Sequence, residues 1–453
     1  MKLLSNPKEL ENLFTPMKEI VEGINEKVLK DLPIHTKMQL KTLRSGHYKS
    51  FIRQLKIYRE LFELKEALKG KSKFKNYVYR KLLIKLPLKR NYIVFESFKL
   101  GKHYADSPRN IYEYIQENKL NYKCIWVFED KNRKIPGNAK IVKRFSWSYY
   151  YYFATSKYWV SNMRQPLFLL KRDETVFLET WHGTPLKKLV FDMKEVHSAN
   201  PKYKQNFYYQ SRAWDYLLSP NAYSSEIFRR AFKFDKTLLE YGYPRNDILY
   251  APDKEERARK IKQALGIPLD KKVILYAPTW RDDQYYKPGK YKFDLCLDLD
   301  LMKEKLSDEY IVLLRLHYFI ADHIDVSKYD GFAFNLSKYD DIADLYLISD
   351  ILITDYSSVF FDFANLKRPI LFYTYDLEKY RDTLKGFYLD IEKEAPGPLL
   401  MTSEEVVNAI LHIDEIKEEF SEIYDEFYRR FCSWHDGKAT EKVFKKVFLD
   451  VNP

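Results

Sequence analysis

The sequence predicts an α/β protein with two Rossmann-like, doubly wound domains that face a cleft, preceded by a basic helical extension. From about residue 91 onward, short apolar runs alternate with helical patterns, which is typical of parallel sheets. A charged, helix-forming stretch at 253–266 interrupts this alternation, which then starts again. Apolar residues make up 45% and charged residues 31% of the 453 residues, so packed cores are expected and wholesale disorder is not.

The first domain is expected over residues 91–252, where six apolar runs predict strands and residues 107–118 predict a helix. The predicted strands are 91–97, 122–130, 157–162, 175–181, 216–220 and 238–244.

The second domain is expected over residues 253–453, beginning with the charged helix that Gly266 terminates. Its predicted strands are 271–280, 309–317, 331–337, 348–356 and 369–375. A Pro- and Gly-containing break at 390–399 then precedes a helical tail at 403–450.

The extension, residues 1–90, carries the charge of the protein. The net charge of +13 lies entirely in residues 31–90, which hold 17 Lys and Arg but 4 Asp and Glu. Apolar and aromatic residues recur there at helical spacing, so the segment predicts basic amphipathic helices. Such helices favour anionic surfaces, either an acidic membrane leaflet or nucleic acid. The charge pattern alone leaves both alternatives open.

Several classes of protein are excluded or disfavoured by what the sequence lacks. No apolar run approaches the roughly 18–20 residues of a membrane-spanning helix, and the N-terminus lacks the apolar stretch of a signal peptide. The three cysteines are far apart, which fits reduced cytosolic thiols. Asp298 and Asp300 form a D-x-D pattern, but carboxylates at a helix start need no metal to explain them. We therefore predict a protein of the cytosolic side without a metal site or cofactor.

A first candidate for chemistry is His182, which follows the strand at 175–181. Gly183 permits close backbone approach, Thr184 adds a hydroxyl, and Pro185 suits the first position of a helix. This pattern aims an imidazole from a strand end across a helix N-terminus.

A second candidate is the turn after the strand at 348–356. The strand ends at Thr354, and Asp355, Ser357 and Ser358 lie before an apolar helix. Hydroxyls and unpaired N–H groups at a helix N-terminus form an anion site, although plain helix capping is the alternative.

The other strand ends of the second domain supply further basic and polar groups. His317 ends the strand at 309–317 and Arg315 lies on the same face two residues earlier. Thr279 and Arg281 end the strand at 271–280, where Arg281 could reach a phosphate. Histidine is suited to take a proton from a hydroxyl that attacks phosphorus.

Together these motifs resemble the CDP-glycerol glycerophosphotransferase family of teichoic acid primases and polymerases. The resemblance runs from about Asn91 to Phe448. It rests on the sequences WHGTPLKKL, GYPRND, YAPTWR, LLRLHY, TDYSSVFFDFANLKRPILFY and DGKAT, which occur in family order.

The resemblance implies a GT-B-like fold and a functional pair of histidines at His182 and His317. His182 would be the base on the acceptor hydroxyl and His317 a contact to the donor diphosphate. Ser357 and Ser358 would bind the diphosphate beside Arg281. Arg245, within GYPRND, and the polar residues of the other motifs complete the expected substrate-binding set.

The implied reaction moves glycerol phosphate from CDP-glycerol to an undecaprenyl-diphosphate-linked acceptor and releases CMP. A CDP-ribitol transferase and a GT-B glycosyltransferase that uses a nucleotide sugar are the alternatives. Because the family works peripherally at the cytoplasmic face of the cell membrane, residues 31–90 are expected to bind an anionic membrane rather than nucleic acid.

Overall fold

The computed structural model forms two compact units, Met1–Lys85 and Leu86–Pro453. The structure describes residues 15, 18, 22, 32–194, 200–279, 285–287, 290–291, 295–316, 325–377 and 386–449.

The first unit is helical, as the extension was predicted to be. It contains α3 (Ile34–Arg44), α4 (Tyr48–Leu68), α5 (Lys71–Lys81) and the short 3₁₀ helix η2 (Leu83–Lys85). Lys81 joins α5 to α4 through ion pairs of 2.7 Å with Glu60 and 2.8 Å with Glu63. Several of the large apolar side chains described in this unit are exposed, among them Leu61 by 61% and Leu68 by 68%. None of the helices in the described residues is long and apolar enough to cross a bilayer.

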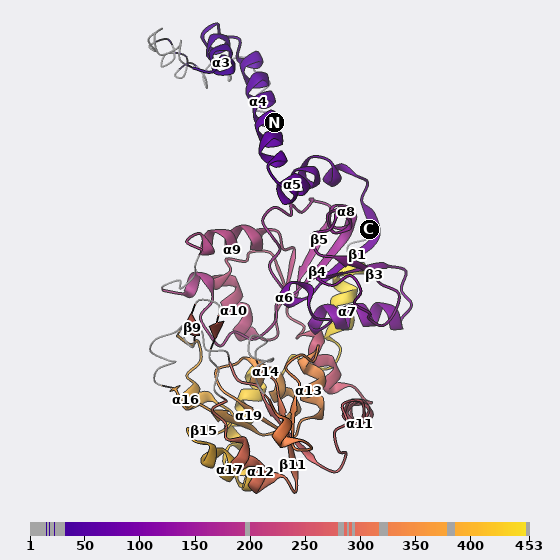
Figure 1. The fold of residues 1–453 in the computed structure, drawn as a ribbon, viewed down its shortest axis with the longest axis vertical. Coiled ribbons are helices and arrows are strands. Elements are labelled where there is room, and N and C mark those ends of the chain that lie inside the picture. The colour runs from indigo at the N-terminus through magenta and orange to yellow at the C-terminus, as the bar shows by residue number, and fades with distance from the viewer. Residues whose placement is uncertain are drawn as a thin grey trace. The chain divides into compact units, whose positions relative to one another are not determined.

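The second unit contains two parallel sheets, one after the other along the chain (Figure 1). The first sheet has the order β3-β2-β1-β4-β5-β6-β7. Its strands are β1 (Lys89–Glu96), β2 (Lys123–Phe128), β3 (Lys140–Lys143), β4 (Ser156–Ser161), β5 (Val176–Glu179), β6 (Tyr216–Leu218) and β7 (Thr237–Leu239). The helices between them are α6 (Phe98–Gly101), α7 (Asp106–Glu117), α8 (Trp147–Thr155), η3 (Val190–Asp192), α9 (Tyr203–Arg212) and α10 (Ala222–Ala231).

The second sheet has the order β12-β11-β8-β13-β14-β15. Its strands are β8 (Lys272–Tyr276), β11 (Tyr310–Leu314), β12 (Ala333–Asn335), β13 (Ile351–Thr354), β14 (Ile370–Tyr373) and β15 (Leu399–Leu400), and a separate antiparallel pair consists of β9 (Tyr285–Lys287) and β10 (Lys290–Tyr291). The helices are η4 (Pro244–Tyr250), α11 (Lys254–Ala264), α12 (Leu299–Leu306), η5 (Ser327–Tyr329), α13 (Ile342–Ile348), α14 (Val359–Phe363), η6 (Ala364–Leu366), α16 (Ile391–Glu394), α17 (Ser403–Leu411), α18 (Ile413–Glu419), α19 (Ser421–Phe431), α20 (Ala439–Phe444) and η8 (Lys445–Leu449).

This architecture confirms the predicted fold class. Each of the eleven predicted strands overlaps an observed one. Four observed strands were not predicted from the sequence, namely β3, β9, β10 and β15, which are two to four residues long. The long strands of both sheets are buried on both faces, which is why they read as continuous apolar runs rather than alternating ones.

Local capping chemistry sets several helix boundaries. Gly266, with φ of +69°, follows the end of α11 as predicted. Asp298 caps α12 by accepting the N–H groups of Asp300 (2.9 Å) and Leu301 (3.0 Å), so its carboxylate serves the helix start. Thr402 forms a capping box at the start of α17.

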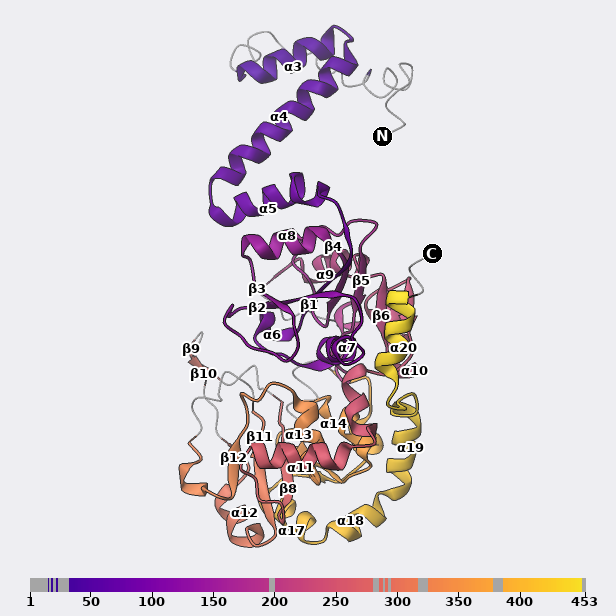
Figure 2. The ribbon, with the colours of Figure 1, turned by 90° about the vertical axis from the view of Figure 1, so that its right-hand side faces the viewer.

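The C-terminal segment returns to the first sheet. Figure 2 shows α20, in yellow, beside β6 rather than on the second sheet. Val443, Phe444 and Phe448 are buried in the apolar cluster that also contains Ile111 and Tyr112 of α7. The chain therefore passes twice between the two sheets, at η4 and again after α19.

Candidate active site

A pocket of about 400 Å³ lies between the two sheets of the second unit. The first half contributes the segment Trp181–Lys187 and Leu189, and the second half contributes Pro278, Thr279 and Tyr356–Ser358. These segments follow the carboxyl ends of β5, β8 and β13, and this edge is where parallel sheets bind ligands. The pocket brings together six predicted residues, namely His182, Gly183, Thr184, Thr279, Ser357 and Ser358.

The two walls of the pocket meet closely at Gly183. A Cβ atom placed on this glycine would lie 3.0 Å from the Ser358 hydroxyl oxygen. The WHGT and TDYSS sequences, predicted separately, are therefore adjacent in the folded chain.

His182 is held in one orientation by the first sheet. Its Nδ1 lies 2.7 Å from the carbonyl oxygen of Asn162, which follows β4. Because a carbonyl oxygen only accepts, Nδ1 carries the proton and the lone pair of Nε2 remains available as a base. The surrounding protein lowers the pKa of His182 by desolvating the imidazolium; the hydrogen bond to Asn162 and the charge of Asp106 oppose this shift. A neutral imidazole is therefore favoured at physiological pH.

The helix predicted from Pro185 was wrong. The segment after His182 is irregular, and its backbone pairs with residues 386–388 instead. The N–H of Tyr388 donates to the Leu186 carbonyl (2.8 Å), and Lys187 forms an isolated bridge with Phe387. Because residues 386–388 bind the backbone groups of residues 186–188, the stretch after His182 does not form helical hydrogen bonds. Within the described residues, this stretch therefore offers no helix N-terminus beside His182.

The second wall is ordered by two buried residues. Thr354 donates its hydroxyl proton to the Ala277 carbonyl (2.8 Å), and Asp355 accepts the N–H of Thr279 (2.8 Å). Both residues thus join the ends of β13 and β8 below the pocket surface. Ser357 and Ser358 line the pocket, and Ser358 precedes the five-residue helix α14.

Two of the predicted arginines lie away from the pocket lining. Arg315 donates to the carbonyl oxygens of Leu336 (2.9 Å) and Ser337 (2.8 Å). Arg245 is buried and donates to Asp106 (2.8 Å) and Asp362 (2.6 Å). These two aspartates raise the pKa of Arg245 although burial opposes them. Nothing in the sequence pattern marked either aspartate as a partner.

Arg245 nevertheless lies close behind the pocket. Its guanidinium stacks over the Tyr243 ring at 4.7 Å, and the Tyr243 hydroxyl donates to the Gly183 carbonyl (3.2 Å). Asp106 begins α7 in the first half, whereas Asp362 belongs to α14 in the second. The arginine therefore links both halves to the loop that carries His182.

The two remaining predicted residues, His317 and Arg281, lie outside the described residues. Within the described part of the chain, no group of three or more His, Cys, Asp or Glu side chains could hold a metal ion.

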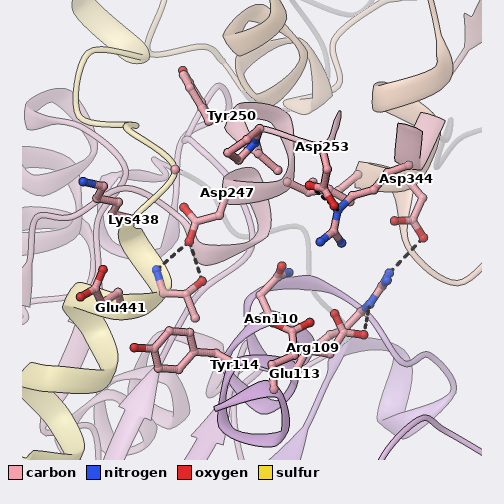
Figure 3. Close-up of a pocket in the computed structure, with 18 of the residues that line it drawn as sticks. Arg109, Asn110, Glu113, Tyr114, Asp247, Tyr250, Asp253, Asp344, Lys438 and Glu441 are labelled. Carbon is pink, nitrogen blue, oxygen red and sulfur yellow. Dashed lines mark hydrogen bonds and ion pairs between the residues drawn. The ribbon is translucent and has the colours of Figure 1, made fainter. Parts of the chain in front are cut away.

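A second pocket, of about 440 Å³, lies where α7, η4, α11 and α13 meet (Figure 3). Its charged groups largely satisfy one another. Arg109 bridges Glu113 and Asp344, and Asp247 accepts two hydrogen bonds from Thr440. It contains none of the predicted site residues, so the pocket with His182 is the candidate active site.

Comparison with known proteins identifies the family of this chain. The sequence profile described as CDP-Glycerol:Poly(glycerophosphate) glycerophosphotransferase matches residues 78–449. The teichoic acid poly(glycerol phosphate) polymerase of Bacillus subtilis (strain 168) is 49% identical over 85% of this chain, which spans 53% of that protein. The teichoic acid glycerol-phosphate transferase of Staphylococcus aureus (strain NCTC 8325) is 44% identical over 85% of this chain and all of that protein.

The solved structures agree with the sequence comparison. The wall teichoic acid polymerase TagF superposes with a TM-score of 0.83 at 43% identity, covering 88% of this chain and 98% of that one. One TagF structure is of a histidine-to-asparagine variant soaked with CDPG. Because the profile matches residues 78–449 and the Staphylococcus aureus relative is covered over its whole length at 44% identity, this chain belongs to the CDP-glycerol:poly(glycerophosphate) glycerophosphotransferase family.

Proposed function

We propose that this protein transfers glycerol phosphate from CDP-glycerol to a terminal hydroxyl of a lipid-linked teichoic acid chain and releases CMP. Family membership and the glycerol-phosphate relatives support the donor. The observation that carries the chemistry is His182, whose ring is oriented in the pocket between the two sheets with Nε2 as the basic atom.

The proposed reaction is a direct displacement at the β-phosphorus of CDP-glycerol. The acceptor oxygen bonds to this phosphorus as its proton moves to Nε2 of His182. The bond from the phosphorus to the oxygen bridging the two phosphates breaks, and CMP leaves with that oxygen. The lowered pKa of His182 supports this role, because the base is neutral before the reaction.

The second wall of the pocket supplies the donor side. Thr279, Ser357 and Ser358 offer hydroxyl and backbone groups to the diphosphate. By the family resemblance, Arg281 and His317 would offset the charge that develops on the leaving group. No protein-held metal is part of this proposal.

The helical first unit is proposed to bind an anionic membrane surface. Its exposed apolar side chains include Ile34, Leu61 and Leu68, in a region that holds the whole positive charge excess. Basic amphipathic helices of this kind place their apolar face in the lipid interface, and each nearby Lys or Arg adds about 1 kcal/mol. This surface would keep the enzyme near a lipid-linked acceptor.

The test of the catalytic assignment is CMP release from CDP-glycerol with a synthetic lipid-linked primer. We expect His182→Gln to lower turnover by at least about 100-fold. The matched control is His412→Gln, because His412 is exposed and its Nδ1 also lies near a carbonyl oxygen, that of Asn408 at 2.9 Å. Near-normal turnover of His182→Gln would remove His182 from the chemistry.

A donor panel separates the alternatives. CDP-glycerol is expected to be the preferred donor over CDP-ribitol and UDP-sugars, because the ribitol-phosphate relatives are 28% identical and the poly(glycerol phosphate) polymerases up to 49%. Release of UDP from a UDP-sugar instead would favour a glycosyltransferase.

Membrane binding is tested with the full chain and a chain lacking residues 1–85. The full chain is expected to sediment with phosphatidylglycerol vesicles and the shortened chain is not. Equal sedimentation, or salt-dependent binding to nucleic acid without preference for these vesicles, would contradict the proposal.

A further inference from the structure

Trp181, directly before His182, has an unusual backbone conformation. Its φ of +51° lies in the left-handed region, which a bulky side chain rarely adopts. Two interactions hold this turn. The Trp181 N–H donates to Oε1 of Glu179 (3.2 Å), and the Thr180 hydroxyl donates to the Trp181 carbonyl (3.3 Å). Backbone strain of this kind persists only where the surrounding structure enforces it, and it is common at functional sites.

The indole of Trp181 packs directly on the imidazole. The two ring centroids lie 4.4 Å apart with an angle of 27° between the planes. The indole is itself supported by an aromatic cluster, in which Phe232 lies at 4.6 Å and Phe228 at 6.1 Å. The His182 ring is therefore held by a stacked indole and, at Nδ1, by the Asn162 carbonyl.

We propose that Trp181 is a positioning residue for the transfer reaction: its left-handed backbone and stacked indole fix the His182 ring so that Nε2 faces the acceptor hydroxyl. This inference rests on the proposed function of His182 as the base. The indole makes no bond to the reacting atoms in this scheme. Its contribution is geometric, because a displacement of about 1 Å at a catalytic group can cost roughly 100-fold in rate.

The test compares substitutions of two tryptophans in the same aromatic cluster. Trp181→Leu removes the stacked ring, whereas Trp181→Phe keeps an aromatic ring. Trp214→Leu is the matched control, because Trp214 is fully buried and its ring centroid lies 6.5 Å from that of Trp181.

We expect Trp181→Leu to lower kcat by about 100-fold while KM for CDP-glycerol changes less than about threefold. Trp181→Phe is expected to restore kcat to within about tenfold of the wild type. Trp214→Leu should lower the melting temperature but leave kcat of the folded protein nearly unchanged. Equal losses of kcat in the two leucine variants would overturn the proposal, since both would then reflect general damage to the core.

A spectroscopic measurement tests the positioning separately from catalysis. The proton on Nδ1 of His182 is observed by NMR on histidine-labelled full chain and assigned by its absence in His182→Gln. The NMR signal of this proton should persist in Trp214→Leu. In Trp181→Leu it should be lost, because the His182 ring moves and the proton exchanges with water. A signal retained in Trp181→Leu would refute the positioning role. Normal turnover of His182→Gln would instead refute the proposed base, while the NMR signal would still report whether Trp181 holds the ring.

Discussion

Replacing Arg245 by methionine tests the buried link behind the active site. The substitution keeps an unbranched apolar stem and removes the charged guanidinium. Arg245 is 6% exposed and its two carboxylate partners, Asp106 and Asp362, are 3% and 5% exposed. The variant therefore leaves two buried carboxylates without their cation. Asp362 would keep the Asn246 amide (2.9 Å) and Asp106 the N–H of Ser107 (2.5 Å).

The expected loss of stability is large. Removing one partner from a buried ion pair costs about 3–5 kcal/mol, because the remaining charge is uncompensated. The surviving hydrogen bonds to neutral donors offset part of this cost. We therefore expect Arg245→Met to lower the free energy of unfolding by about 4 kcal/mol.

Urea unfolding at pH 7.5, followed by circular dichroism, measures this difference. The triple variant Arg245→Met, Asp106→Asn, Asp362→Asn removes all three charges and should recover part of the lost stability. A decrease in the free energy of unfolding below about 1 kcal/mol for Arg245→Met would refute the reasoning, because two buried carboxylates without their cation should cost more than this. A raised KM for CDP-glycerol at unchanged stability would assign Arg245 to substrate binding instead.

Three further predictions concern the pocket and its surroundings. Gly183→Ala places a methyl group 3.0 Å from the Ser358 hydroxyl oxygen, so kcat/KM should fall about tenfold. The control is Gly70→Ala, whose methyl group meets no atom within 4 Å. Equal activity of the two variants would contradict the prediction. Because the pKa of His182 is lowered, the acidic limb of kcat/KM should lie below pH 6.5, and a limb centred above pH 7 would exclude His182 as the base. Burial lowers the pKa of His435 to about 3, so the unfolded chain takes up this proton near pH 6.5 but the folded chain does not. The free energy of unfolding therefore decreases as pH falls from 6.5 toward 3, by about 1.4 kcal/mol per pH unit for this group. His435→Asn should reduce this pH dependence in urea unfolding. An unchanged pH dependence would refute the prediction.

Much of the fold could be predicted because its signals are local. A buried parallel strand appears as a run of consecutive apolar residues, as in Tyr310–Leu314, and a glycine with positive φ, such as Gly266, marks a helix end. His182 and Ser358 could also be found, since both follow apolar strands at the edge where parallel sheets bind ligands. Very short strands such as Leu399–Leu400 carry too few residues for a period to show.

Sequence by itself determined which segments are buried, where strands end, and which polar side chains follow them, because these properties depend on neighbours within a few residues. Only the tertiary structure decided what those side chains meet. Arg245 pairs with Asp106 and Asp362, which lie 139 and 117 residues away in the chain. The loop after His182 is not a helix because residues near 387 occupy its backbone groups. The free energy of a buried charge or backbone group depends on partners that the packing of the two sheets brings together, and no local pattern specifies them.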